Sequence, residues 1–236
     1  MSNISNRKSK ARKKVIHQEK SASPVQEEHA ENLWATRGMD DVSFQRGAQV
    51  TWWSVLGGIA VAALLTKIDS LPSAFMEGKW YVTLYFLATC LVIVNSWVQT
   101  AWGSLVLKWQ ISISTSVSLF FQGISMAVAA LNITNPAIWY AAMFIVLGTA
   151  LFNELVFSKS HAWITLPAEL INQARAGISI YIGISVFALA SSIYLALRPS
   201  IIAELVLGIV AVLISIFALV RQHLGMTEEK RRMGIA

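Results

Sequence analysis

Charged residues are scarce in this chain. Only 14% of its 236 residues are Asp, Glu, Lys or Arg, whereas 55% are hydrophobic, and the mean hydropathy is +0.56. Between Trp80 and Asn153 the only charged residue is Lys108. Because a water-soluble domain usually carries about 25% charged residues, this composition excludes that class and predicts a membrane protein.

The chain also lacks the sequence patterns by which common enzymes are recognised. It has no Walker A sequence, no dinucleotide fingerprint, and neither His-Glu-x-x-His nor Gly-x-Ser-x-Gly. Its single cysteine, Cys90, excludes an internal disulfide. His161 and Glu169 share a long loop, but two such residues are too few ligands for a metal site. We therefore expect no enzyme activity, no cofactor and no metal.

What the chain has instead is a series of long apolar runs. A helix needs about 20 apolar residues to cross a hydrocarbon layer about 30 Å thick, and these runs are too long for the strands of a membrane barrel. We predict an all-α, polytopic membrane protein with a transmembrane domain at 49–220 and a short cytoplasmic tail at 221–236. Its six transmembrane helices are expected at about 50–66, 80–103, 110–131, 137–157, 177–197 and 200–220.

The N-terminal 48 residues are polar and contain a basic cluster. This composition buries too little apolar surface to offset chain entropy, so we expect the tail to be mostly disordered. One interpretation is that the cluster binds anionic lipid head groups; the other is a solvated tail that only keeps its end in the cytoplasm. Because half of the net charge of +6 arises in this tail, it does not indicate nucleic-acid binding. The basic cluster consists of Arg7, Lys8, Lys10, Arg12, Lys13 and Lys14.

The distribution of lysine and arginine predicts the orientation. With six spans, both termini and the loops around Lys108 and 158–176 share one side, which carries sixteen of the nineteen basic residues. The opposite side carries only Lys67, Lys79 and Arg198. Since basic loops remain in the cytoplasm, both termini are predicted to be cytoplasmic, in a cell inner membrane or plasma membrane.

The second and third spans contain more amides and hydroxyls than contact with lipid explains. At 100° per residue, these groups gather on one face of each helix, and Glu154 near the end of the fourth span has a similar predicted depth. They either line a wet vestibule or pore, or hydrogen-bond between packed helices. The candidates for a polar lining are Asn95, Gln99, Thr115, Gln122 and Glu154.

Three further features predict local contacts. In the fifth span Ala188, Ser192 and Ala196 recur every four residues, which favours close packing within the bundle or between protomers. Glu204, in the first turn of the sixth span, is expected to pair with Arg198. Pro167 is expected to precede a short helix, at about 168–175, on the membrane surface.

The first span resembles, over a few residues, a six-span potassium-channel family with a Phe-Ser-Asp signature. Trp53-Ser54-Val55 stands at the corresponding place, followed by a run of small and apolar residues. Val55 replaces the aspartate, and the second span has no matching histidine. No functional residue is therefore carried over.

Two functions remain open from the sequence. The first is a small channel-like or transporter-like permeation protein with a polar lining from spans 2 and 3. The second is a non-transporting membrane subunit, anchor or assembly factor that recruits a partner through its tail and the 158–176 loop. The expected partners are the lipid bilayer and either a second copy of the chain or another subunit of a membrane complex.

Overall fold

All of the described chain that has regular structure is helical. The computed structural model describes residues 47, 50–105, 113–158 and 168–232, which fall within one compact unit, 46–236. The all-α prediction is confirmed for this part of the chain. The basic cluster and the rest of the predicted tail lie outside the described residues.

Each of the six predicted segments contains a helix. These are Val50–Leu65, α4 (Tyr81–Leu105), α5 (Ile113–Leu131), α6 (Pro136–Ser158), α7 (Ala168–Leu197) and α8 (Ile201–Arg232). Four of them, α4, α6, α7 and α8, are long and apolar enough to cross a membrane. Val50–Leu65 and α3 (Ser70–Met76), bent by 46° relative to each other, together form a possible fifth span. The apolar part of α5 is shorter, at Ser116–Leu131.

The short helix α3 and the turn that follows it are outside the predicted spans. Gly78 has a φ of +74°, a left-handed conformation that glycine adopts without steric cost. The Lys79 N–H then donates to Ala74 O at 2.8 Å and the Gly78 N–H to Phe75 O at 3.1 Å, which is the Schellman end of a helix. Beyond it, a hydrogen bond from Lys79 to Glu77 at 2.7 Å raises the pKa of the lysine.

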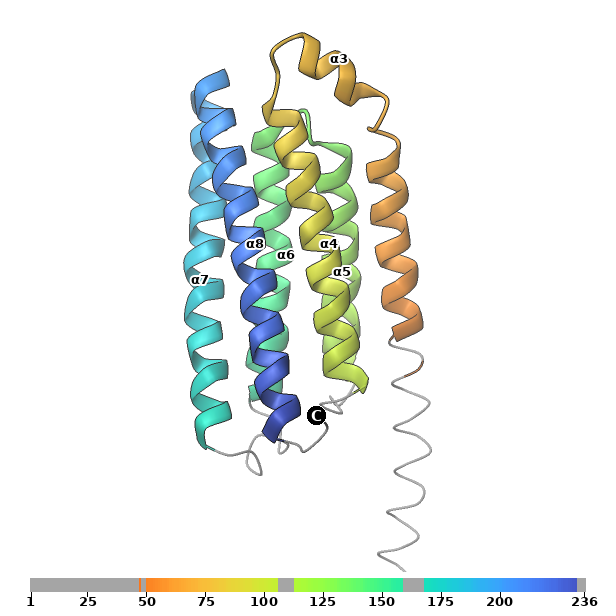
Figure 1. Ribbon diagram of the computed structural model, residues 1–236, viewed down its shortest axis with the longest axis vertical. Helices are drawn as coiled ribbons and strands as arrows, with labels where there is room; N and C mark the ends of the chain where they lie inside the picture. The colour runs from red at the N-terminus through yellow and green to blue at the C-terminus, as the bar shows by residue number, and fades with distance from the viewer. Residues whose placement is uncertain (1–46, 48–49, 106–112, 159–167, 233–236) are drawn as a thin grey trace, which may run out of the picture. The chain divides into compact units, whose positions relative to one another are not determined.

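The helices pack as two closely associated groups. In Figure 1, α4 and α8 run side by side, and α6 contacts both α5 and α7. Small residues allow two of the closest approaches: Gly208 of α8 faces Leu84 of α4, and Gly123 of α5 faces Leu56. By contrast, α7 and α8 make few backbone contacts with each other.

The exposed faces are apolar, as expected for helices surrounded by lipid. The side chains of Val186, Ile193, Leu213 and Phe217 are between 52% and 61% exposed. Fully buried positions include the small residues Ala60, Ala88, Ala129 and Ala130, which let membrane helices approach closely. Exposed large apolar residues around a core rich in small ones are the arrangement that a bilayer favours.

Two helices extend further than the sequence indicated. Helix α7 begins at Ala168, so the predicted short surface helix is wrong: residues 168–176 are the first turns of α7 instead. They are therefore not part of a loop, as was expected for 158–176, and 159–167 lie outside the described residues. Helix α8 likewise continues to Arg232. Hydropathy indicates only the part of a helix that lies in lipid. The helix itself can continue into water, because its backbone hydrogen bonds do not require lipid, and it is then longer than the apolar run.

Candidate functional site

Asn95 and Gln99 lie one turn apart on α4, and the structure connects them to α8 and α7. The Gln222 amide, with its nitrogen assigned toward Asn95, donates to Asn95 Oδ1 and accepts from Gln99 N at 2.8 Å. The Tyr181 hydroxyl of α7 donates to Gln99 Oε1 at 3.3 Å. We refer to Asn95, Gln99, Tyr181 and Gln222 as the amide cluster, because three of its four side chains are amides and the fourth, Tyr181, bonds directly to one.

The polar face of α5 has different neighbours. Gln122 is only 5% exposed, and the Ser118 hydroxyl donates to Thr149 O of α6 at 3.1 Å. Thus Asn95 and Gln99 bond to α7 and α8, whereas Ser118 bonds to α6. Thr115 and Glu154 are placed on α5 and α6 by their backbones, but their side chains lie outside the described part of the chain.

A second polar group, which the sequence analysis did not single out, joins α4 to α6. The Thr89 hydroxyl donates to Tyr85 O at 2.6 Å and accepts from Trp139 Nε1 at 2.8 Å. The rings of Tyr85 and Trp139 lie 4.9 Å apart, and those of Tyr85 and Tyr140 lie edge to face at 5.9 Å. We name Tyr85, Thr89, Trp139 and Tyr140 the tyrosine cluster.

The tyrosine cluster also bonds to α8. The Tyr85 hydroxyl donates to Glu204 O at 3.1 Å, and the Tyr140 hydroxyl donates to Leu207 O at 2.7 Å. Buried tyrosine and tryptophan need such partners for their polar atoms. The sequence signal available was Tyr81 and Tyr85 at a four-residue spacing on one helix, with Trp139-Tyr140 in the first turns of another.

Glu204 has a different environment from the one expected. Its carboxylate lies near the Tyr81 hydroxyl, whereas Arg198 takes part in no ion pair recorded among the described residues. The predicted Glu204–Arg198 pair is therefore wrong in this structure. Helix α8 starts at Ile201, so Glu204 lies in its first turn and points to α4.

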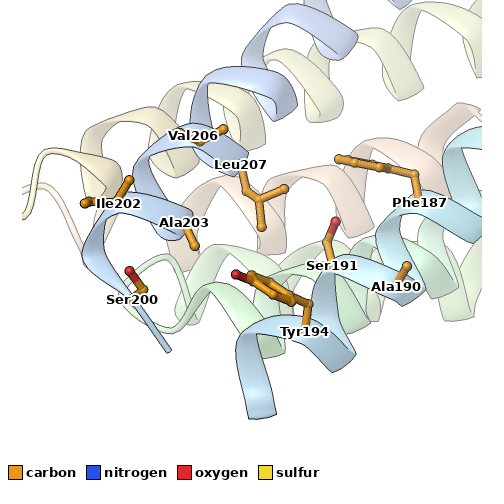
Figure 2. A pocket seen from close by; sticks show the side chains of 9 residues that line it. All are labelled: Phe187, Ala190, Ser191, Tyr194, Ser200, Ile202, Ala203, Val206 and Leu207. Atoms are coloured by element: carbon orange, nitrogen blue, oxygen red, sulfur yellow. The ribbon is translucent and has the colours of Figure 1, made fainter. Parts of the chain in front are cut away.

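A pocket of about 580 Å³ lies between α7 and α8. Figure 2 shows Phe187 and Tyr194 of α7 directed toward α8, and Leu207 of α8 directed toward α7. Phe187 and Leu207 connect this pocket to the tyrosine cluster: Phe187 packs edge to face on Tyr140 at 6.1 Å, and Leu207 O accepts the Tyr140 hydroxyl. The pocket thus lies beside the tyrosine cluster.

The predicted packing face of α7 contains three different environments. Ala188 is buried, Ser192 donates to Ala137 O of α6 at 2.9 Å, and Ala196 is exposed. Ser192 therefore joins this face to α6 within the chain. Its last residue, Ala196, does not.

The chemistry of the described site is hydrogen bonding. Within the described residues no three His, Cys, Asp or Glu side chains gather as a metal site requires. The amide cluster and the tyrosine cluster both connect α4 and α8 to α6 or α7. Comparison of the chain with protein families, curated proteins and solved structures finds no match.

Proposed function

We propose that this protein is a non-transporting subunit or anchor of a membrane assembly, whose bundle is fixed by interhelical hydrogen bonds. One observation supports this most strongly. The amides that were candidates for a pore lining, Asn95 and Gln99, bond to Gln222 and Tyr181 of neighbouring helices. Amides paired in this way stabilise helix packing and have fewer free groups with which to replace the hydration shell of an ion.

Six spans with both termini cytoplasmic, in an inner or plasma membrane, form part of this proposal. The 19 residues of α5 extend about 28 Å at 1.5 Å per residue, close to the ~30 Å of the hydrocarbon core. The side of the membrane with only three basic residues, Lys67, Lys79 and Arg198, is the outer side by the positive-inside rule. In this arrangement the N-terminal tail and residues 158–176 are available to a cytoplasmic partner.

Deletion of residues 2–30 tests partner recruitment. We expect the shortened chain to insert into the membrane normally and to lose proteins that co-purify with the full chain. The control replaces Arg7, Lys8 and Lys10 by glutamine, which separates the contribution of charge from that of the whole segment. Unchanged co-purifying proteins after the deletion would contradict recruitment through the tail.

Permeation is the second candidate, and one observation favours it. The α4–α8 pair carries polar groups near both ends, with Glu204 beside the tyrosine cluster and Gln222 in the amide cluster. An ionisable group inside a span is a functional candidate. Purified protein in liposomes should then conduct an ion or small solute, and Asn95→Leu should alter the flux while Thr83→Leu, at an exposed position on α4, should not. A protein without flux under these conditions excludes the second candidate.

A further inference from the structure

The pocket between α7 and α8 has a mouth that faces the surroundings and a floor inside the bundle. The mouth is formed by Tyr194, Ile202 and Val206, which are 49%, 74% and 51% exposed. The floor contains Phe187 and Leu207, which are partly buried, and Ser191, which is only 5% exposed. The mouth is therefore part of the apolar surface that lipid covers around both helices.

The dimensions of the pocket match one leaflet of a bilayer. It runs from Ser200, at the turn between the helices, to Phe187, ten residues before the end of α7. Ten helical residues extend about 15 Å, half of a hydrocarbon core of about 30 Å. A volume of about 580 Å³ is also within the range of small-molecule sites.

The polar groups of the pocket lie mainly at the end next to the turn. Tyr194 and Ser200 bring hydroxyls to this end, and Arg198 lies between them in the chain, exposed and with no ion pair recorded among the described residues. The remaining lining is apolar except for Ser191. An occupant that matches this pattern has an apolar chain of leaflet length and an anionic, hydrogen-bonding head.

We propose that the pocket between α7 and α8 binds one acyl chain of an anionic phospholipid, with the phosphate at Arg198, Tyr194 and Ser200. The bilayer supplies this ligand directly, because the mouth opens onto lipid-facing residues. One basic residue near the head-group layer favours an anionic lipid about fivefold. The proposal requires only that α7 and α8 are spans, and it holds for either proposed function.

The test uses the full chain in phosphatidylcholine vesicles with a trace of phosphatidylglycerol or phosphatidylcholine bearing a photoactivatable acyl chain. Cross-links mapped by mass spectrometry should concentrate on 187–194 and 202–207, and phosphatidylglycerol should exceed phosphatidylcholine severalfold. Ala190→Trp fills the pocket and should reduce these cross-links at least fivefold. Ala196→Trp is the matched control on the other side of α7, and it should leave them unchanged. Arg198→Gln should equalise the two lipids.

Several results would overturn the proposal. Cross-links spread evenly over all lipid-exposed helices would mean that the pocket selects no lipid. Equal cross-linking in Ala190→Trp and Ala196→Trp would place the lipid elsewhere, and an unchanged lipid preference in Arg198→Gln would remove the head-group assignment. A change in oligomeric state with Ala190→Trp, without loss of lipid, would assign the pocket to a second copy. Val206→Trp fills the pocket from α8 and replaces Ala190→Trp if that variant does not fold.

Discussion

At the scale of single residues, Thr89 shows how one hydroxyl can join two helices. It donates to a carbonyl of its own helix and accepts the indole N–H of Trp139, and both side chains are buried. A threonine that bonds back to its own helix is inexpensive to bury. Because the same oxygen also accepts from α6, Thr89 contributes to tertiary structure as well.

Replacing Thr89 by valine should destabilise the bundle. The substitution preserves shape but leaves the buried Trp139 N–H without its acceptor, which costs about 1–2 kcal/mol. We expect a lower midpoint in thermal unfolding of the purified protein in detergent. Thr83→Val, at an exposed position on α4, is the control and should unfold like the wild type. Equal midpoints for the two variants would show that the Thr89–Trp139 bond contributes nothing.

Sequence alone predicted which residues of α4 are polar and on which face, but not their partners. Asn95 and Gln99 follow from helical periodicity, whereas Gln222 lies beyond the end predicted for the sixth span. Gln222 became a partner because α8 continues past residue 220, which hydropathy cannot reveal. Thr89 lies on the same helix, and its bond to Trp139 depends on a contact between residues 50 positions apart.

At the scale of elements, the helix Val50–Leu65 packs on α5 through a glycine. A Cβ added at Gly123 would lie 2.7 Å from Leu56 Cβ, a contact that side-chain rotation does not relieve. The helix must therefore shift if any larger residue replaces this glycine.

Gly123→Ala should separate the two helices and lower stability by about 1–3 kcal/mol, the usual cost of overpacking. Gly148→Ala in α6 is the matched control, since an added Cβ there meets nothing within 4 Å. Removing a helical glycine without a clash should leave stability equal or slightly higher. Unfolding of both variants in the same detergent measures the difference, and equal stability would contradict the close packing at Gly123.

The apolar runs predicted where the helices occur, but they predicted less accurately at which residues each helix begins and ends. Pro136 begins α6 as expected for a first-turn proline, and Pro199 separates α7 from α8. Helix α3 was missed because seven residues are too few to show a clear periodicity. The pocket could not be predicted, since it depends on how far α7 and α8 diverge.

At the scale of the whole molecule, the excess of basic residues on one side predicts the topology. With Cys90 replaced by alanine, a cysteine at Ser73 should react with an impermeant maleimide added to intact cells. A cysteine at Lys230 should react only after the membrane is opened. Both native positions are exposed, so access depends on the side of the membrane. The reverse labelling pattern would contradict the proposed orientation and would indicate that both termini lie outside the cytoplasm.

The central claim is that the amide cluster holds helices together. A double-mutant cycle with Asn95→Leu and Gln222→Leu measures this directly, by reversible unfolding of the protein in bicelles. Interhelical hydrogen bonds in membranes average about 0.6 kcal/mol and reach about 1.7 kcal/mol, so we predict a coupling energy in that range. Thr83→Leu with Thr227→Leu, at exposed positions of the same two helices, should show none. No coupling between Asn95 and Gln222, together with an ion or solute flux that Asn95→Leu abolishes, would contradict the claim.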